Sequence, residues 1–238
     1  MRINGTEVAK HGAKQLTVEI QPPQDKAAAE WVQGALEPLA GEETTHTFDE
    51  IKIGLIFRGP DPGTILRNIG HVLELLKKET VLDLDGYRDN FRAWYRGSEI
   101  KKVGRSKRVR LVDLEFVGYA VGKEVTKVFM GKRTAEIVRE GSRATPAIVT
   151  ILPTQNLETF TIGGLTDDPI VVRDLTAGVE VVIDGRDGSS VERAGTSIVN
   201  KAKDVDLWEP PALKQERTAL SFSETEPKVT ITYTPIWL

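Results

Sequence analysis

The side chains best suited to metal binding or proton transfer near neutral pH are the three histidines, His11, His46 and His71. No two of them have the HxH or HExxH spacing that places a pair of imidazoles on one metal ion. The chain contains 0 cysteines, so a zinc site would also lack thiolate ligands. We therefore interpret the histidines as solvated or core side chains, and we expect neither a metal site nor a cofactor.

Nucleophilic and phosphate-binding motifs are incomplete. No GxSxG elbow occurs and no serine stands beside a histidine, although a Ser-His-Asp triad is assembled in space and leaves no pattern in a sequence. The segment GKRT at 131–134 matches a phosphate loop only in part, because Thr126 stands where that loop needs glycine and Arg133 where it needs serine or threonine. We expect that the chain is not an enzyme.

Clustered carboxylates are the next candidates for chemistry. The segment DGRDGSS at 184–190 lacks the ligand spacing of an EF-hand, and Asp-Gly pairs between strands are common in turns. Asp167–Asp168 directly precedes Pro169, and Asp204 lies close to Asp206. We interpret all of these carboxylates as parts of turns or of solvated strand edges.

The most conspicuous charged segment is RGSEIKKVGRSKRVR, residues 96–110, which contains a single glutamate. Its seven basic residues are Arg96, Lys101, Lys102, Arg105, Lys107, Arg108 and Arg110. One interpretation is a hairpin with a solvated tip, in which Arg108 and Arg110 face outward while Val109 and Leu111 face inward. A second is a candidate protein-interface patch, and a third is a contact with nucleic acid.

Two observations disfavour nucleic acid as the partner of this segment. The net charge of the chain is −3, which argues against general binding to a polyanion. The tip also lacks aromatic residues on which bases stack, although Trp94 and Tyr95 directly precede it.

The bulk properties of the chain bound its class. Its 238 residues suit one large domain or two ordinary ones, and a 39% hydrophobic content is enough for proper cores. The opening MRINGTEVAKHGAKQL lacks an apolar signal-peptide region, and no run reaches the ~20 apolar residues of a membrane span. The absence of cysteine favours folding in a reducing cytoplasm.

Residues 145–238 hold 8 Lys/Arg and 14 Asp/Glu (net −6), whereas residues 1–144 hold 24 Lys/Arg and 21 Asp/Glu (net +3). This difference in charge favours two units with different surfaces.

The first half of the chain predicts strands and helices in alternation. KQLTVEIQPP and FDEIKIGLIF predict strands, and Ile51, Ile53 and Leu55 face one side of the second. The alanine-rich segment 25–39 predicts a helix ending at Pro38.

The best helix signal in the chain follows GPDPG. Asp61 is the expected N-cap, Pro62 stands at the first helical position, and Lys77 and Lys78 lie near the end. Apolar residues then recur on one face, namely Ile65, Ile69, Val72, Leu73 and Leu76. The segments TVLDLDGY, NFRAWYRGSEI and RVRLVDLEFVGYAV follow and predict strands of an antiparallel sheet.

The second half of the chain predicts only short strands. REGSRATP, residues 139–146, is a polar break and the expected linker. Beyond it, short apolar segments separated by Gly, Asp and Pro turns are typical of a β-sandwich. In the last of them, KVTITYTPI, we expect Val229, Ile231 and Tyr233 to face the core and the intervening threonines to face out.

The order of these segments resembles a known family. INGTEVAKHGAKQLTVEI, IKIGLIFRG, TILRNIGHVLELLKK, TVLDLDGYRDNFRAWYRG and RVRLVDLEFVGYAVGKEV follow one another as in the N-terminal domain of siphophage distal tail proteins. The rest, from FTIGGLTDDPIVV to KVTITYTPIWL, is similar to the galectin-like sandwich of that family. The resemblance implies a mainly β fold with one or two helices in an N-terminal α+β, ring-forming domain (residues 1–140), followed by a galectin-like β-sandwich (residues 145–238).

The resemblance also implies a function. Members of the family form a hexameric ring in the tail tip, or baseplate, of phages and prophages of Gram-positive hosts. The ring joins the tail tube to the adsorption apparatus, and it contacts the tail tube protein, the tape-measure protein, the tail-associated hub protein and often receptor-binding proteins. We therefore expect a homo-hexameric virion protein, made in the cytoplasm of the host bacterium, without a membrane partner. The basic segment 96–110 is then expected to lie at the ring channel or against a neighbouring subunit.

The alternative function is that of a carbohydrate-binding β-sandwich protein in which Trp208, Trp237 or Tyr233 forms a stacking platform. The even spacing of Tyr233 and Trp237 instead favours core packing for these two. The H-x-N-x-R and W-x-x-E-x-R segments of galactoside-binding galectins are absent, since no histidine follows His71 and Trp208–Glu209 leads into two prolines.

Overall fold

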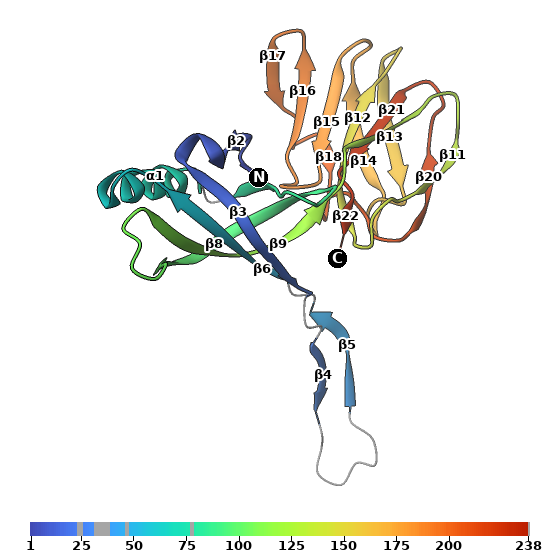
Figure 1. The fold of residues 1–238 in the computed structure, drawn as a ribbon. Helices are drawn as coiled ribbons and strands as arrows, with labels where there is room; N and C mark the ends of the chain where they lie inside the picture. Colours follow the sequence, from blue (N-terminus) through green and yellow to red (C-terminus); the bar gives the residue numbers. More distant parts are fainter. Residues whose placement is uncertain (23–25, 31–38, 46–47, 77–78, 238) are drawn as a thin grey trace. The chain divides into compact units, whose positions relative to one another are not determined.

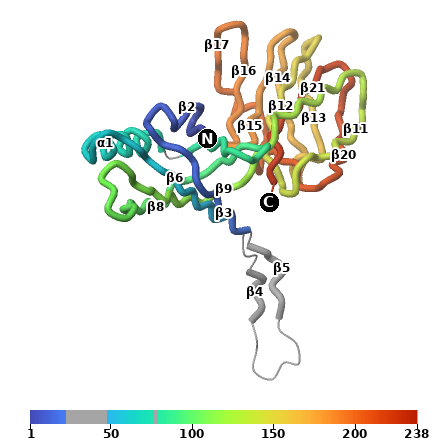
Figure 2. Tube along the Cα trace, viewed as in Figure 1, coloured from blue at the N-terminus to red at the C-terminus, as the bar shows by residue number. Residues whose placement is uncertain are grey.

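The computed structural model describes residues 1–22, 26–30, 39–45, 48–76 and 79–237, with the backbone alone for 26–30 and 39–45. The described chain is mostly β-strand in several antiparallel sheets, with one α-helix in its first half (Figures 1 and 2). This confirms the predicted mainly β fold class. None of the helices within these ranges is long and apolar enough to cross a membrane.

The chain forms two compact units, Met1–Val121 and Gly122–Trp237. The division lies earlier than the expected linker at 139–146. The physical reason is strand pairing: β10 (Val125–Phe129) and β11 (Thr134–Val138) precede that linker, yet they pair with β21 and β20 near the end of the chain.

The first unit is built on one antiparallel sheet with the strand order β2-β1-β7-β8-β9-β6-β3. The bounds of these elements are β1 Arg2–Ile3, β2 Thr6–Glu7, 3-10 helix η1 Val8–His11, β3 Ala13–Gln21, β6 Asp49–Arg58, α1 Pro62–Glu74, β7 Thr80–Asp83, β8 Asn90–Lys102 and β9 Val109–Val121. β6 buries alternate residues, namely Ile51, Ile53, Leu55 and Phe57. They pack in one cluster with the apolar face of α1.

Helix α1 agrees with its sequence signals. The Asp61 carboxylate accepts hydrogen bonds from Thr64 N (3.0 Å) and Thr64 Oγ1 (2.7 Å), and these bonds lower the pKa of Asp61. Of the predicted face, Ile65, Ile69 and Val72 are buried, while Leu73 and Leu76 pack against the same cluster. Lys77 and Lys78 lie outside the described residues.

The helix predicted at 25–39 is wrong where the structure describes it. Lys26–Glu30 forms strand β4, which pairs with β5 (Leu39–Thr45) in a separate two-stranded sheet. Residues 31–38 lie outside the described ranges. Alanine favours a helix only weakly, by a few tenths of a kcal/mol per residue, so a paired strand partner overrides that preference.

The second unit is a β-sandwich, as predicted. One sheet has the order β10-β21-β12-β15-β16-β17 with β19 beside β12, and the other has the order β11-β20-β13-β14-β18. The remaining bounds are β12 Thr145–Leu152, β13 Leu157–Gly163, β14 Ile170–Leu175, β15 Glu180–Asp184, β16 Ser190–Ala194, β17 Ser197–Asn200, β18 Val205–Asp206, β19 Ala212–Leu213, β20 Arg217–Phe222, β21 Lys228–Tyr233 and β22 Ile236–Trp237. Both sheets contribute to a single apolar core.

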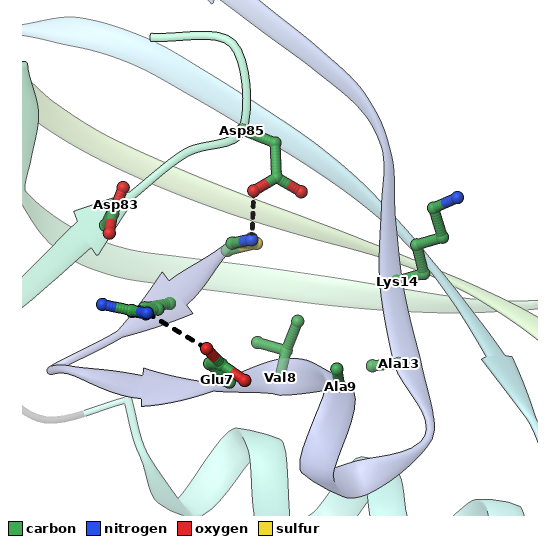
Figure 3. A pocket seen from close by; sticks show the side chains of 9 residues that line it. Glu7, Val8, Ala9, Ala13, Lys14, Asp83 and Asp85 are labelled. Atoms are coloured by element: carbon green, nitrogen blue, oxygen red, sulfur yellow. Dashed lines mark hydrogen bonds and ion pairs between the residues drawn. The ribbon is translucent and has the colours of Figure 1, made fainter. Parts of the chain in front are cut away.

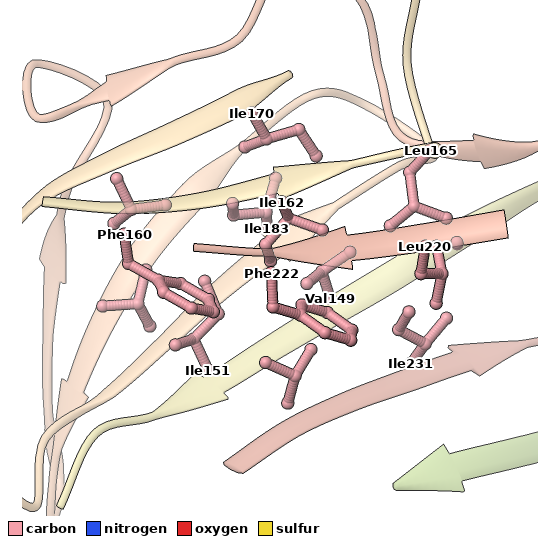
Figure 4. Packing of buried hydrophobic residues seen from close by; sticks show 14 of the residues in the cluster. Val149, Ile151, Phe160, Ile162, Leu165, Ile170, Ile183, Leu220, Phe222 and Ile231 are labelled. Atoms are coloured by element: carbon pink, nitrogen blue, oxygen red, sulfur yellow. The ribbon is translucent and has the colours of Figure 1, made fainter. Parts of the chain in front are cut away.

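The core of the sandwich is held by side chains that meet between its two sheets (Figure 4). Phe160 of β13 stacks on Phe222 of β20 with ring centroids 6.4 Å apart. β21 pairs with β10 on one edge and with β12 on the other, so it lies inside its sheet. Val229, Ile231 and Tyr233 are all buried, which confirms the predicted inner face of this strand.

We expect Ile231→Ala to destabilise the second unit by about 2–5 kcal/mol, because Ile231 is fully buried and its loss leaves a cavity. The matched control is Val128→Ala on the neighbouring strand β10, where the side chain is 55% exposed and the expected cost is below about 1 kcal/mol. Urea unfolding followed by circular dichroism measures both. Equal midpoints for the two variants would contradict this description of the core.

Candidate protein interface on the β8–β9 hairpin

The basic segment 96–110 forms the end of the long β8–β9 hairpin. The two strands pair from Asn90 opposite Val121 to Lys102 opposite Arg110. The connection is closed by a hydrogen bond from Ser106 N to Val103 O (3.1 Å). The segment is therefore a hairpin, and we call residues 102–110 the basic tip.

Four of the seven candidate residues carry the exposed charge of the tip, and they are Lys102, Arg105, Lys107 and Arg108. Within the described part of the chain, none of these four takes part in an ion pair. Their ammonium and guanidinium groups therefore face solvent without a compensating carboxylate among the described residues, as expected of a surface that meets an acidic partner.

Lys101 belongs to a different environment. Its Nζ lies 2.8 Å from Asp113 Oδ2 and 3.0 Å from Glu99 Oε2. These two carboxylates raise the pKa of Lys101, chiefly through the hydrogen bond to Asp113. The positive charge of Lys101 is thus balanced by two carboxylates, and it adds little to the electrostatic field of the basic tip.

Arg110 is half-buried and shapes the tip. Its Nη1 donates hydrogen bonds to two main-chain carbonyls, Val109 O (2.7 Å) and Ser106 O (3.0 Å). Both N–H groups of Nη1 are thereby held against carbonyls of the arginine's own turn. We therefore assign Arg110 to the conformation of the turn.

Arg96 lies apart from the other six residues. It falls at the irregularity of β8 between Tyr95 and Gly97, where the register against β9 shifts. There it lines a shallow cavity of about 270 Å³ with Glu50, Lys52, Glu115, Phe116 and Val117. The structure therefore does not bring Arg96 together with the basic tip.

The predicted inward orientation of Val109 and Leu111 is wrong. The core residues of β9 are Val112, Leu114 and Phe116, so Leu111 belongs to the opposite face and is only half-buried. Pairing with β6 sets this register, since Leu114 lies opposite Ile53. It keeps Asp113 out of the core, where an ionised carboxylate would be costly.

Sequence reasoning missed two exposed apolar residues, one beside the basic tip and one within it. Ile100 is 47% exposed and Val103 is 36% exposed, although both stand among charged residues. Their exposure could have been predicted from their positions in the sequence. Both residues lie close to the turn of the hairpin, beyond the edge of the apolar core. Apolar side chains ringed by charge are typical of protein interfaces.

A second charged site, the cavity of about 360 Å³ in Figure 3, is lined by residues of both signs. The amino group of Met1 pairs with Asp85, and Arg2 Nη2 lies 3.1 Å from Glu7 Oε1. These charges neutralise one another. Within the ranges that the structure covers, no group of three or more His, Cys, Asp or Glu residues is placed to hold a metal ion.

The histidines are not all scattered. His11 and His71 lie with ring centroids 5.7 Å apart, although they are distant in sequence, and His46 lies outside the described residues. His71 also approaches Glu74 (Nδ1 to Oε2, 3.4 Å). The pair follows from the packing of η1 against α1, which sequence spacing does not reveal.

The carboxylates interpreted as turns and edges fit that interpretation. Asp184 accepts from Arg186 N (2.9 Å), and the Arg186 side chain lowers the pKa of Asp184. Asp206 binds Arg173 (Oδ1 to Nη1, 3.1 Å), and Asp204 binds Lys201 (3.0 Å). Each of these carboxylates has a structural partner.

The aromatic residues considered for sugar stacking differ in exposure. Tyr233 is buried, as expected for core packing, whereas Trp237 is 38% exposed. Trp208 is 84% exposed and precedes Glu209, which binds Lys214 Nζ at 2.8 Å. The expected core position therefore holds for Tyr233 but not for Trp237.

The arrangement of elements defines a fold seen in phage tail proteins. No protein-family model matches the chain, and no curated protein sequence does. Solved structures match over nearly the whole chain, however, and they are components of phage tails. The chain has the fold of a distal tail protein, as the order of its segments predicted.

Three of the similar structures show the extent of the match. The crystal structure of the SPP1 Dit (gp 19.1) protein, a paradigm of the hub adsorption apparatus in phages that infect Gram-positive bacteria, has a TM-score of 0.79. The alignment covers 99% of this chain and 98% of that chain at 14% identity. The phage P2 baseplate in its activated conformation has TM-scores of 0.54 with Ca and 0.53 with Sr, each covering 95% of this chain and 92% of that chain at 10% identity.

We expect Arg110→Ala to loosen the turn of the basic tip, because the two carbonyls that Arg110 binds lose their donor. Hydrogen exchange measured by mass spectrometry should then speed up at the amides of residues 103–109. Arg108→Ala is the matched control, since its exposed side chain has no such bond within the described chain. Indistinguishable exchange in the two variants would show that Arg110 does not order the turn.

Proposed function

We propose that the chain is a structural subunit of a phage tail tip, or baseplate, and that it forms a hexameric ring that joins the tail tube to the adsorption apparatus. The observation that carries the proposal is the shared fold over 99% of this chain and 98% of SPP1 Dit. A match of this extent includes both compact units and their order along the chain. The proposed role is non-enzymatic.

The two units take different parts in the proposed assembly. The N-terminal unit forms the ring, and the C-terminal galectin-like sandwich projects from it. A ring requires heterologous surfaces on each subunit, one complementary to the other. The exposed basic tip supplies one such charged surface. The partners are other copies of the chain, the tail tube protein, the tape-measure protein, the hub protein and receptor-binding proteins, and the location is the virion tail tip.

The ring is tested by the mass of the protein in solution. One chain has a mass of 26.3 kDa, so a hexamer has 6 × 26.3 ≈ 158 kDa. We expect native mass spectrometry and light scattering on a sizing column to detect this species, with its share rising with concentration. Addition of the cognate tube or hub protein should promote closure. A monomer under all of these conditions would contradict the proposal.

One observation favours carbohydrate binding as a second function. Among the residues whose side chains the structure describes, Trp208 is the most exposed large apolar one, and its indole ring offers a platform on which a sugar ring can stack. Glu209, Asp167 and Lys214 lie together next to it in an ion-pair network with Lys214 Nζ 2.8 Å from both carboxylates. These groups suit hydrogen bonding to hydroxyls.

A glycan array separates the two functions. If the second function holds, the wild type should bind at least one glycan saturably and Trp208→Ala should lose that binding. Trp237→Ala is the matched control, because Trp237 is only 38% exposed. A wild type that binds no glycan would leave the ring proposal as the single function supported.

A further inference from the structure

Most sheet edges of the described chain are protected against pairing with another chain. An edge strand exposes unpaired N–H and C=O groups, and a charge, a proline or a very short length hinders the approach of a further strand. In the first unit, edge strand β3 carries exposed Lys14 and Glu19, and edge strand β2 has only 2 residues. In the second unit, β10 carries exposed Lys127, β11 carries exposed Glu136, and β18 has 2 residues.

The edge strand β17 (Ser197–Asn200) has no such protection. It ends the sheet β10-β21-β12-β15-β16-β17, next to its hairpin partner β16 (Figure 1). Its sequence SIVN contains neither a charged residue nor proline, and all 4 of its residues are exposed. The two aliphatic side chains, Ile198 and Val199, are 65% and 56% exposed. An open edge of this composition is a template on which another strand can pair.

The register of the β16–β17 hairpin shows which main-chain groups of β17 are free. Lys201, directly after β17, donates its N–H to Ser190 O of β16 (3.0 Å). In an antiparallel ladder, alternate residues of a strand direct their N–H and C=O groups toward the same neighbour. Val199 therefore bonds to β16, as Lys201 does. The N–H and C=O groups of Ile198 and Asn200 point to the open edge, where the described sheet has no further strand.

These free groups are complementary to those of a second β17 that runs antiparallel to the first. When Ile198 lies opposite Asn200 of a second copy, the two residues can exchange both of their N–H···O=C bonds, and a two-fold axis repeats the exchange. Val199 then lies opposite Val199 of the second copy, on the axis and between the two bonded pairs. Because β17 has no charged residue, this register places no like charges opposite each other within the strand.

We propose that β17 pairs with β17 of a second copy, so that the sheet of the sandwich continues across a two-fold axis. The other edges whose side chains the structure describes are charged or very short, which leaves β17 as its own best partner within this chain. The contact is distinct from the proposed ring, because a ring is closed by two different surfaces whereas this contact is made by one surface with itself.

The contact is weak between two single copies. It involves 4 residues on each side, and interfaces of small area are typical of transient association. A ring would carry several copies of β17 at once, and contacts made together strengthen one another through effective concentration. Pairing is therefore expected at high concentration for single chains and at lower concentration for assembled ones.

Cysteine cross-linking tests the register, because the chain has 0 cysteines. Val199→Cys places two thiols opposite each other, where Cα atoms about 4.5 Å apart lie within the range of a disulfide. Ile198→Cys is the matched control, since Ile198 is at least as exposed but lies diagonal to its own copy, roughly 7–8 Å away. Under mild oxidation of the full chain, Val199→Cys should form covalent dimers at least about tenfold faster. Equal rates for the two variants would overturn the pairing.

A proline at the free edge tests whether main-chain bonds hold the contact. In the Val199→Cys chain, Ile198→Pro removes an N–H that points away from β16 and that only the contact uses. The fast cross-linking should then be lost. Ile198→Ala is the control, because it shortens the side chain and keeps the N–H, so cross-linking should persist. Circular dichroism and the urea midpoint verify that both variants fold. Fast cross-linking in the proline variant would overturn pairing through the main chain.

A charge on β17 tests the contact without cysteine chemistry. Val199→Lys places two ammonium groups opposite each other, so we expect the dissociation constant of the pairing, measured by sedimentation, to rise at least about tenfold. Val128→Lys on β10 is the matched control, with a side chain 55% exposed, and it should associate like the wild type. Equal association of the wild type and Val199→Lys would overturn the pairing. The ring is judged separately, by whether the species of 6 × 26.3 ≈ 158 kDa persists in Val199→Lys.

Discussion

The pairing of β9 with β6 on one edge and with β8 on the other is the constraint on which the first unit depends. Both ladders run along nearly the full length of β9. Because side chains alternate between sheet faces, a slip of one residue would exchange the buried and the exposed sets. Leu114 would leave the core and Asp113 would enter it. The same register carries β8 and β9 past the core and thereby presents the basic tip to solvent.

Much of the fold was predictable where a pattern has one physical solution. Asp61 and Pro62 start α1 as predicted, and the strict alternation of Val229, Ile231 and Tyr233 predicted an inner face of β21 correctly. One prediction, the helix at 25–39, failed because a pairing partner decided the outcome. β4 is a strand because β5 lies beside it, and alanine content cannot report a partner several residues away.

The position of the candidate site along the chain was predicted, but the arrangement of its side chains was not. The number of basic residues drew attention to the hairpin. Only the structure shows that some of these residues are exposed charges, that Lys101 pairs with Asp113, and that Arg110 binds carbonyls of the turn. One error was avoidable. Apolar residues change from odd to even positions within RVRLVDLEF, and burial of Leu111 would have required burial of Asp113 on the same face.

Cohesion within a unit and the proposed attraction between copies have different physical bases. Each unit is held by an apolar cluster of its own, and none of the exposed basic residues of the hairpin tip belongs to either cluster. Exposed charges contribute little to folding stability, since solvent screens them and long side chains lose entropy when they pair. The same charges act on association, where several like charges on one hairpin sum into a field. Under the proposed function, substitution of the tip charges would therefore change association between copies while both apolar cores stay intact.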